Sequence, residues 1–201
     1  MRSSDIQRDL FHVAQGQGGY FTAKQAAGLG YLAPKRNYHV HAGNWVREYR
    51  GIYRLALFPE PERPDLILWW LWSRGRDDSP VGVFSHRTAL SLHELTDSNP
   101  AKIDLTVPRT FRKGAEVPKI LQLHYGHVNA EEREIISGVP VTNALRTIID
   151  VRLDKLLPKA VLAAALREAV RSGKVTKRQL SDAKKNLKIA AILEALEEGQ
   201  P

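Results

Sequence analysis

The sequence predicts an α+β protein: an N-terminal winged helix-turn-helix followed by a mixed α/β domain with a helical C-terminal tail. The first 60 residues hold three short helical patterns and a β-hairpin pattern, and they end in the proline-rich run 58–64. Beyond this run, strand and helix patterns alternate, and from Leu156 onward the pattern is almost wholly helical. We therefore expect one domain over residues 1–60 and a second over 61–201.

The three N-terminal helices are predicted from their start and stop signals. Ser4 opens a capping box before the first helix, and Thr22 opens another before a short second helix. Pro34, a residue favoured in the first helical turn, opens a third helix that Gly43 ends. Helices in this order, with a hairpin after them, are typical of a winged helix.

The hairpin is predicted by two β-rich segments, 45–49 and 52–56, which are joined at Arg50-Gly51. Helical spacing of Tyr38, Ala42 and Trp45 predicts that these three side chains face the core. The opposite face of the third helix then carries hydrogen-bond donors and no acids.

Such a helix can place its side chains against base edges in the major groove while the wing contacts the neighbouring backbone. We expect the basic and amide side chains to read bases and the hairpin arginines to contact phosphate or the minor groove. The predicted DNA-binding residues are Lys35, Arg36, Asn37, His39, Arg47, Arg50 and Arg54. An ordinary solvated basic face is the alternative interpretation.

The second domain is predicted to mix helices and strands. Ser85 and Thr142 are suited to cap helices, and Ile103, Leu105 and Val107 alternate with polar residues as in a half-buried strand. The expected helices cover 64–73, 86–95, 143–150, 160–170 and a last segment from Thr176, and the expected strands cover 81–84, 103–107, 120–124, 134–136 and 139–141.

Composition narrows the class of partner. The chain has 30 Lys and Arg against 22 Asp and Glu, a net charge of +8, which favours nucleic acid over an acidic protein surface. It has no cysteine, which excludes disulfides and thiolate zinc sites and is compatible with the cytoplasm. No secretory signal is expected, and the apolar run 66–72 is far shorter than the roughly 20 residues that span a bilayer.

A second basic concentration lies in the C-terminal helices. It is a candidate secondary surface for DNA or for an acidic or RNA-like partner, and a solvated helix face is the alternative. Its residues are Arg171, Lys174, Lys177, Arg178, Lys184 and Lys185.

Signatures of enzymes and metal sites are weak. The best carboxylate set for a nuclease, Asp104 with Glu116 and Lys119, has poor spacing for one hard cation. Two histidine pairs, His86 with His93 and His124 with His127, lack a convincing third ligand for zinc. We expect no catalytic residue, no metal and no cofactor.

Six segments together resemble the AbiE-type antitoxins over roughly residues 4–155. They are GYFTAKQA (19–26), RGIYRL (50–55), FSHRTAL (84–90), IDLTVP (103–108), GVPVT (138–142) and RTIID (146–150). The third helix departs from the family in Tyr38, His39 and His41, so no operator sequence is carried over. The tail from Leu156 is not matched.

The resemblance implies an antitoxin of a type IV toxin-antitoxin system, which acts in phage defence by abortive infection. It implies a winged helix that binds inverted repeats in its own promoter, as an autoregulating repressor, and an antitoxin domain over residues 61–201. The partners implied are double-stranded DNA and a nucleotidyltransferase-like toxin, antagonised without a stable complex. A monomer in solution or a dimer on DNA is expected. A scaffold module that binds its toxin directly is the alternative, and a nuclease ranks third.

Overall fold

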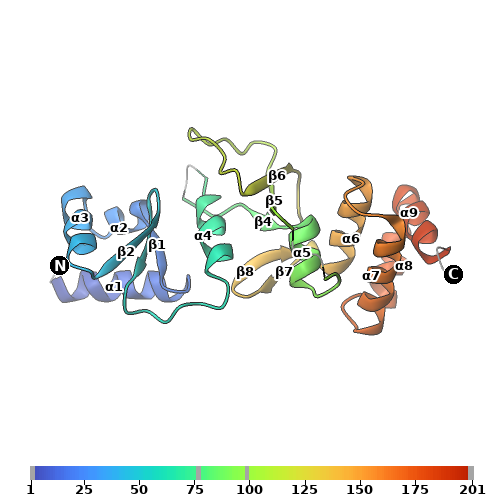
Figure 1. Ribbon diagram of the computed structural model, residues 1–201, viewed down its shortest axis with the longest axis horizontal. Coiled ribbons are helices and arrows are strands. Elements are labelled where there is room, and N and C mark those ends of the chain that lie inside the picture. The colour runs from blue at the N-terminus through green and yellow to red at the C-terminus, as the bar shows by residue number, and fades with distance from the viewer. Residues whose placement is uncertain (1–2, 76–77, 98–99, 199–201) are drawn as a thin grey trace. The chain divides into compact units, whose positions relative to one another are not determined.

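A computed structural model of the protein describes residues 3–75, 78–97 and 100–198, and it divides the chain into two compact units (Figure 1). The first unit covers Met1–Gly82 together with the short segment Ser137–Val139. The second covers Val83–Ile136 and Pro140–Pro201. The predicted α+β class, with an N-terminal winged helix and a helical C-terminus, is confirmed.

The first unit has the element order of a winged helix. Its three strands form an antiparallel sheet in the order β1-β3-β2, in which β3 pairs with both neighbours. Its elements are α1 (Ser3–Gln15), β1 (Tyr20–Thr22), α2 (Ala23–Gly28), α3 (Ala33–His41), β2 (Trp45–Tyr49), β3 (Ile52–Leu55) and α4 (Pro64–Trp72).

Local signals explain most of these boundaries. The capping box predicted at Thr22 is present. The Thr22 hydroxyl accepts from the backbone N–H of Gln25, and the side chain of Gln25 accepts from the backbone N–H of Thr22. The start predicted at Ser4 is wrong, because Ser4 already lies inside α1. Strand β1 was not predicted, since a strand of three residues is too short for an alternating pattern.

An aromatic core holds α1, α2 and the sheet together. The Phe21 ring meets the Trp45 indole edge-on at 4.8 Å between centroids, and Tyr31 meets the same indole at 5.0 Å. Leu10 and Ala14 of α1 are buried against this cluster. The winged helix therefore has a core of its own.

The first unit extends beyond the domain expected over residues 1–60. Helix α4 contacts β1 and β3, and it buries Leu66, Ile67 and Leu71. The proline-rich run before α4 was interpreted as a linker between domains, whereas the compact unit continues to Gly82. The reason is that an almost wholly apolar helix must be covered, and the winged-helix sheet covers it.

The second unit is built around a five-stranded mixed sheet. The strand order is β6-β5-β4-β8-β7, in which β4 runs antiparallel to β5 and parallel to β8, while β5 and β6 are parallel. Its elements are β4 (Val83–Phe84), α5 (His86–Leu92), β5 (Ile103–Val107), β6 (Leu121–Tyr125), the 3-10 turn η1 (Ala130–Glu132), β7 (Arg133–Ile136), β8 (Val139–Thr142), α6 (Ala144–Leu153), α7 (Lys159–Arg171), α8 (Lys177–Ala183) and α9 (Leu187–Glu198).

Two caps in this unit differ from the prediction. The side chain of Asn143, not Thr142, caps α6 by accepting from the backbone of Arg146 at 2.9 Å. The Thr142 hydroxyl is buried and pairs with the hydroxyl of Thr147 at 2.7 Å. Ser85 stands at the N-cap of α5 but makes no side-chain capping bond there, because it is engaged by neighbouring side chains.

The helical tail packs on α6. Side chains of α6, α7 and α9, among them Ile148, Leu162 and Leu193, are fully buried in one cluster. The last helical segment, expected from Thr176 onward, is divided: residues 184–186 separate α8 from α9, and Leu187 is 86% exposed. Within the described residues no helix has the length and apolar character needed to cross a membrane.

Candidate nucleic-acid interface

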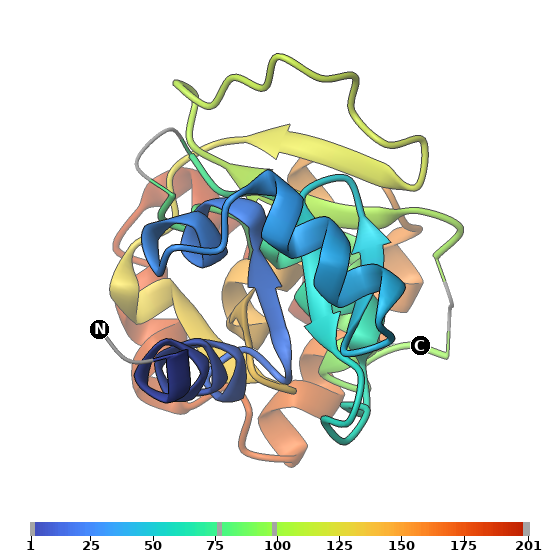
Figure 2. The ribbon, with the colours of Figure 1, turned by 90° about the vertical axis from the view of Figure 1, so that its left-hand side faces the viewer.

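Helix α3 lies beside the hairpin and begins with a fixed first turn (Figure 2). Leu32 is extended, Pro34 lies in the first turn, and the guanidinium of Arg36 donates to the carbonyl oxygen of Tyr31 at 2.8 Å. Arg36 is half-buried in this position. This hydrogen bond joins the first turn of α3 to Tyr31, which precedes the helix. Arg36 therefore holds α3 in position and does not point outward as predicted.

The predicted inner face of α3 is wrong, because the helix is rotated about its axis relative to the prediction. Tyr38 is 66% exposed and Ala42 is exposed, whereas Trp45 is buried as expected. In their place the His39 ring turns inward and stacks on the Trp45 indole, with 4.7 Å between centroids and 15° between the planes. A stacked aromatic pair of this kind contributes packing energy beyond the area that it buries.

His39 is therefore a packing residue. Burial and the nearby ammonium of Lys35 lower the pKa of His39 below its ordinary value, which keeps the ring neutral near pH 7. Its Nδ1 lies 3.3 Å from the side-chain amide of Asn44. A neutral, stacked ring adds no cation to a surface for DNA.

Lys35 and Asn37 remain exposed, as predicted. The Lys35 ammonium lies over the Tyr31 ring, 4.5 Å from its centroid, which limits the directions in which the chain can extend. Both residues lie in the first half of α3, the part of a recognition helix that meets base edges.

The hairpin separates its arginines into two kinds. Arg54 donates to the carboxylate of Glu48 at 2.7 Å, and both side chains are largely buried, at 16% and 25% exposure. The hydrogen bond to Glu48 raises the pKa of Arg54. Arg47 and Arg50 are exposed and form no ion pair among the described residues, so they alone carry free positive charge on the hairpin.

A bulge in β2 brings about this separation. The pairing with β3 shifts between Arg47 and Tyr49, so Glu48 has no directly opposite partner. Bulges of this kind redirect a side chain, and here Glu48 turns to Arg54. The one acid beside the exposed arginines is thereby neutralised.

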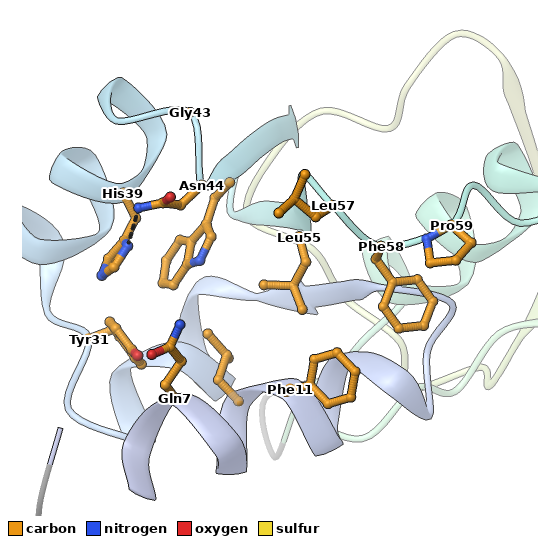
Figure 3. A pocket seen from close by; sticks show the side chains of 12 residues that line it. Gln7, Phe11, Tyr31, His39, Gly43, Asn44, Leu55, Leu57, Phe58 and Pro59 are labelled. Atoms are coloured by element: carbon orange, nitrogen blue, oxygen red, sulfur yellow. Dashed lines mark hydrogen bonds between the residues drawn. The ribbon is translucent and has the colours of Figure 1, made fainter. Parts of the chain in front are cut away.

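A hollow of about 560 Å³ lies behind α3, lined by α1, the start of β2 and the segment after β3 (Figure 3). Phe11, Tyr31 and Phe58 give it aromatic walls, and His39 and Asn44 supply its polar groups. His39 lines this hollow and also stacks on Trp45 of the core, so the hollow borders the contact that holds α3.

The C-terminal basic surface is largely neutralised by acids. Most of its cations lie within 4.0 Å of a carboxylate: Arg171 with Glu168, Lys174 with Glu94, Lys184 with Glu197, and Arg178 and Lys185 with Asp182. Lys177 forms no ion pair among the described residues. Arg171 and Glu168 lie three residues apart on α7, whereas Glu197 of α9 approaches Lys184 only in the folded chain.

The carboxylate set considered for a nuclease is not assembled. Asp104 is fully buried and accepts from Arg87 at 3.1 Å and from His124 at 2.8 Å, while Glu116 and Lys119 are exposed between β5 and β6. Burial raises the pKa of Asp104, but the hydrogen bonds from His124 and Arg87 outweigh burial and hold it below the ordinary value. Asp104 is thus an ionised, buried carboxylate whose hydrogen bonds hold Arg87 and His124 in place.

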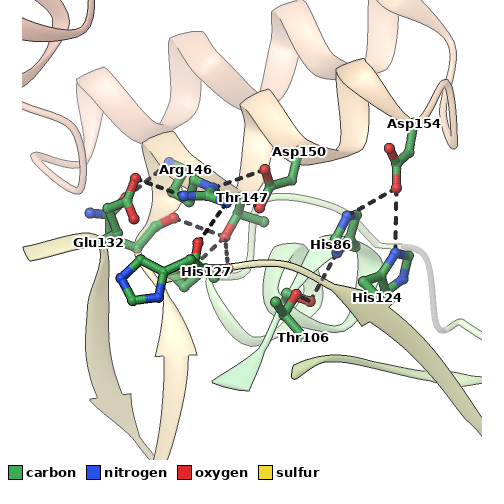
Figure 4. Close-up of polar contacts among 12 residues, drawn as sticks. His86, Thr106, His124, His127, Glu132, Arg146, Thr147, Asp150 and Asp154 are labelled. Atoms are coloured by element: carbon green, nitrogen blue, oxygen red, sulfur yellow. Dashed lines mark hydrogen bonds and ion pairs between the residues drawn. The ribbon is translucent and has the colours of Figure 1, made fainter. Parts of the chain in front are cut away.

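The histidines pair differently from the prediction (Figure 4). His86 stacks on His124 at 3.5 Å between centroids, and both face Asp154, whereas His93 contacts the carbonyl of Thr142 at 2.7 Å. Burial and the neighbouring His124 lower the pKa of His86 to about 4. No sequence signal marks this cluster, because α5, β6 and the end of α6 meet only in the folded sheet.

Comparison with known families decides what the first unit resembles. A protein-family model described as "Transcriptional regulator, AbiEi antitoxin" matches this chain from α1 to the end of the hairpin. Residues 8–56 match the AbiEi antitoxin regulators. The resemblance inferred from the sequence is confirmed over this segment, which contains every residue of the candidate interface. The description of the AbiEi model is that of a regulator of transcription.

Comparison with solved structures concerns the fold. The crystal structure of the RV2827C protein from Mycobacterium tuberculosis is similar, with a TM-score of 0.55 and 13% sequence identity over 96% of this chain and 78% of that chain. At this identity the likeness supports the architecture alone. A search of curated proteins finds no match.

Proposed function

We propose that the protein is the antitoxin of a type IV toxin-antitoxin system, acting in the cytoplasm in phage defence by abortive infection. It binds inverted repeats in its own promoter, represses its operon and counteracts a nucleotidyltransferase-like toxin without a stable complex. DNA binding is assigned to residues 1–60 and antitoxin action to residues 61–201. The match of residues 8–56 to AbiEi regulators supports the antitoxin role.

The observation that carries DNA binding is the set of exposed donors on α3 and the hairpin. Lys35 and Asn37 are exposed on the helix, and Arg47 and Arg50 are exposed on the hairpin. The nearby acid Glu48 is neutralised by Arg54. This arrangement favours a phosphate-bearing partner, because the exposed charge on both elements is positive.

Each exposed residue has a role that follows from its chemistry. Lys35 donates to guanine acceptors, and Asn37 pairs with adenine in the major groove. Arg47 and Arg50 contact phosphate or the adjacent minor groove. Of the other predicted residues, Arg36, His39 and Arg54 hold α3 and the hairpin in place.

Gel-shift and fluorescence-anisotropy titrations with promoter and scrambled duplexes test this function. We expect tighter binding to the promoter and an affinity that falls with salt, with a log-log slope of about −0.9 for each phosphate neutralised. Lys119→Ala removes an exposed cation far from the winged helix in sequence and serves as the control. Equal affinity for both duplexes with a flat salt response would refute the proposal.

The binding stoichiometry tests the repressor geometry. Two protomers are expected on one promoter, with half-sites centred about one helical turn, roughly 34–36 Å, apart. Sedimentation of the protein alone and with a two-site duplex distinguishes a monomer that pairs on DNA from a preformed dimer. Insertion of half a turn between the repeats should abolish the joint occupancy.

Antitoxin action is tested by co-expression with a nucleotidyltransferase encoded beside the protein. Rescue of growth without co-purification of the two proteins supports the type IV assignment. Rescue with a stable complex would favour the alternative, a module that binds its toxin directly. A variant with Arg47→Ala and Arg50→Ala should still rescue growth, since neutralisation is assigned to residues 61–201.

A further inference from the structure

Two histidines and one aspartate of the second unit aim their polar atoms at a common point (Figure 4). His86 Nε2 lies 3.3 Å and His124 Nδ1 lies 3.4 Å from the same oxygen, Oδ2 of Asp154. Ligand atoms of all three residues lie within 4.8 Å of one another. The residues come from α5, β6 and the C-terminal end of α6.

These separations fit the ligands of one small ion better than a direct hydrogen bond. A charge-assisted hydrogen bond between nitrogen and carboxylate oxygen is about 2.7–2.9 Å long. Zinc bonds of about 2.0–2.1 Å in tetrahedral geometry place neighbouring ligand atoms about 3.4 Å apart. The two nitrogen-to-oxygen distances match the second spacing.

The far nitrogen of each ring is already held. His124 Nε2 donates to the buried carboxylate of Asp104 at 2.8 Å, and His86 Nδ1 lies 2.9 Å from the hydroxyl oxygen of Ser85. Arg87 in turn donates to the carboxylate of Asp104, and the hydroxyl of Thr106 donates to that of Ser85. Metal-binding histidines typically have such an outer partner, which fixes the ring and its tautomer.

One outer hydrogen bond fixes which nitrogen of His124 is left to face an ion. An ionised carboxylate only accepts, so Nε2 of His124 carries a proton towards Asp104. Nδ1 is then the nitrogen that faces Oδ2 of Asp154, at 3.4 Å. A cation between these two atoms could be bonded by both.

We propose that His86, His124 and Asp154 form a binding site for one divalent first-row transition ion, of which Zn²⁺ is the representative. Two imidazole nitrogens with one carboxylate oxygen are a donor set that such ions accept. Asp154 is 50% exposed, so water can complete the coordination from the solvent side. The planes of the two stacked rings are 13° apart, so binding would require each ring to rotate slightly about its held far nitrogen.

The site would fasten α6 to the sheet. Asp154 caps the C-terminal end of α6, while His86 and His124 belong to α5 and β6. The other end of α6 is fixed by Arg146, which pairs with Glu132 at 2.7 Å. A bound ion therefore stabilises the folded second unit, because it binds that unit and not the unfolded chain.

Calorimetric titration of the tag-free, chelator-treated full chain with Zn²⁺ tests the site. We expect one ion per chain. Binding should be at least about tenfold weaker in Asp154→Asn and in His124→Gln, since replacing even a hydrogen-bond partner of a metal ligand typically lowers metal affinity by about tenfold or more. His127→Gln removes an exposed histidine outside the cluster and should bind Zn²⁺ as the unchanged chain does. Circular dichroism establishes that each variant is folded.

A second measurement needs no variant. In a nitrogen-15 NMR titration, Zn²⁺ should shift the ring signals of His86 and His124 and leave those of His12, His41 and His127 in place. Co²⁺ in the same site should give visible absorption bands of low coordination number. Absence of Zn²⁺ binding, shifts confined to the other histidines, or unchanged binding in both variants would each overturn the proposal.

Discussion

Two regions of this chain are rich in lysine and arginine, yet the structure treats their charges differently. On α3 and the hairpin, Lys35, Arg47 and Arg50 are exposed and form no ion pair among the described residues. In the C-terminal helices, most cations lie beside a carboxylate from the same helix or a neighbouring one.

The difference between the two regions shows that the number of cations in a segment is a poor guide to the unpaired positive charge on the folded surface. What decides is whether the fold supplies acids to the same place. In the hairpin the bulge turns Glu48 to Arg54 and leaves the other arginines free. In the tail, Glu168 and Glu197 lie close to basic side chains and neutralise them.

The largest effect is expected from the free hairpin arginines. A double variant with Arg47→Ala and Arg50→Ala should weaken binding to every duplex about 100-fold, or about 2.8 kcal/mol. Its log-log salt slope should fall by about 1.8, because two phosphate contacts are lost. Anisotropy titrations at several salt concentrations measure both quantities. An unchanged slope would place the phosphate contacts elsewhere.

A smaller effect on affinity, but a change in sequence choice, is expected from α3. Lys35→Ala and Asn37→Ala should each lose about 1–3 kcal/mol of discrimination at one base pair and bind scrambled DNA almost as before. Competition assays with single-base promoter variants identify the position that is relaxed. Equal loss on promoter and scrambled duplexes would assign both residues to the backbone.

The buried ion pair of the hairpin should matter for stability. Arg54→Ala leaves the Glu48 carboxylate without its partner and should destabilise the first unit by roughly 1–3 kcal/mol. All 4 tryptophans lie in the first unit, so tryptophan fluorescence in urea follows its unfolding alone. Arg47→Ala is the matched control, and a loss of stability as large as that of Arg54→Ala would contradict the distinction between the two arginines.

The smallest effects are expected in the tail. A triple variant with Lys177→Ala, Lys184→Ala and Lys185→Ala should change DNA affinity less than about threefold. Its stability should change by less than about 1 kcal/mol, since exposed ion pairs contribute little. Far-UV circular dichroism and the anisotropy assay give the two values. A loss comparable to that of the hairpin variant would make the tail part of the DNA-binding surface.

Local signals in the sequence predicted much of the fold. The capping box predicted at Thr22 is present, and Thr176, the predicted start of a helical segment, also opens a capping box, because each box depends on residues only three positions apart. The hairpin turn at Arg50-Gly51 is also present, with Gly51 at a positive φ of 75°. The short strand β1 was missed because its role depends on pairing with β3, which lies far along the chain.

The candidate site was predicted less completely, for physical reasons. Helix α3 has no fully buried residue, so its sequence carries no apolar stripe to fix its rotation, and His39 replaced Tyr38 on the inner side. The pairing of Arg54 with Glu48 depends on a bulge that no alternating pattern reveals. The cluster of His86 and His124 arises because α5 and β6, which are far apart in the sequence, meet in the folded second unit.

The hydrogen bond from Arg36 to the Tyr31 carbonyl has a practical consequence. Because the orientation of α3 is held from within, its outward positions 35 and 37 contribute little to keeping the domain folded. Under the proposed function, a library randomised at those two positions should yield folded variants that prefer different duplexes, so that recognition and folding could be engineered separately.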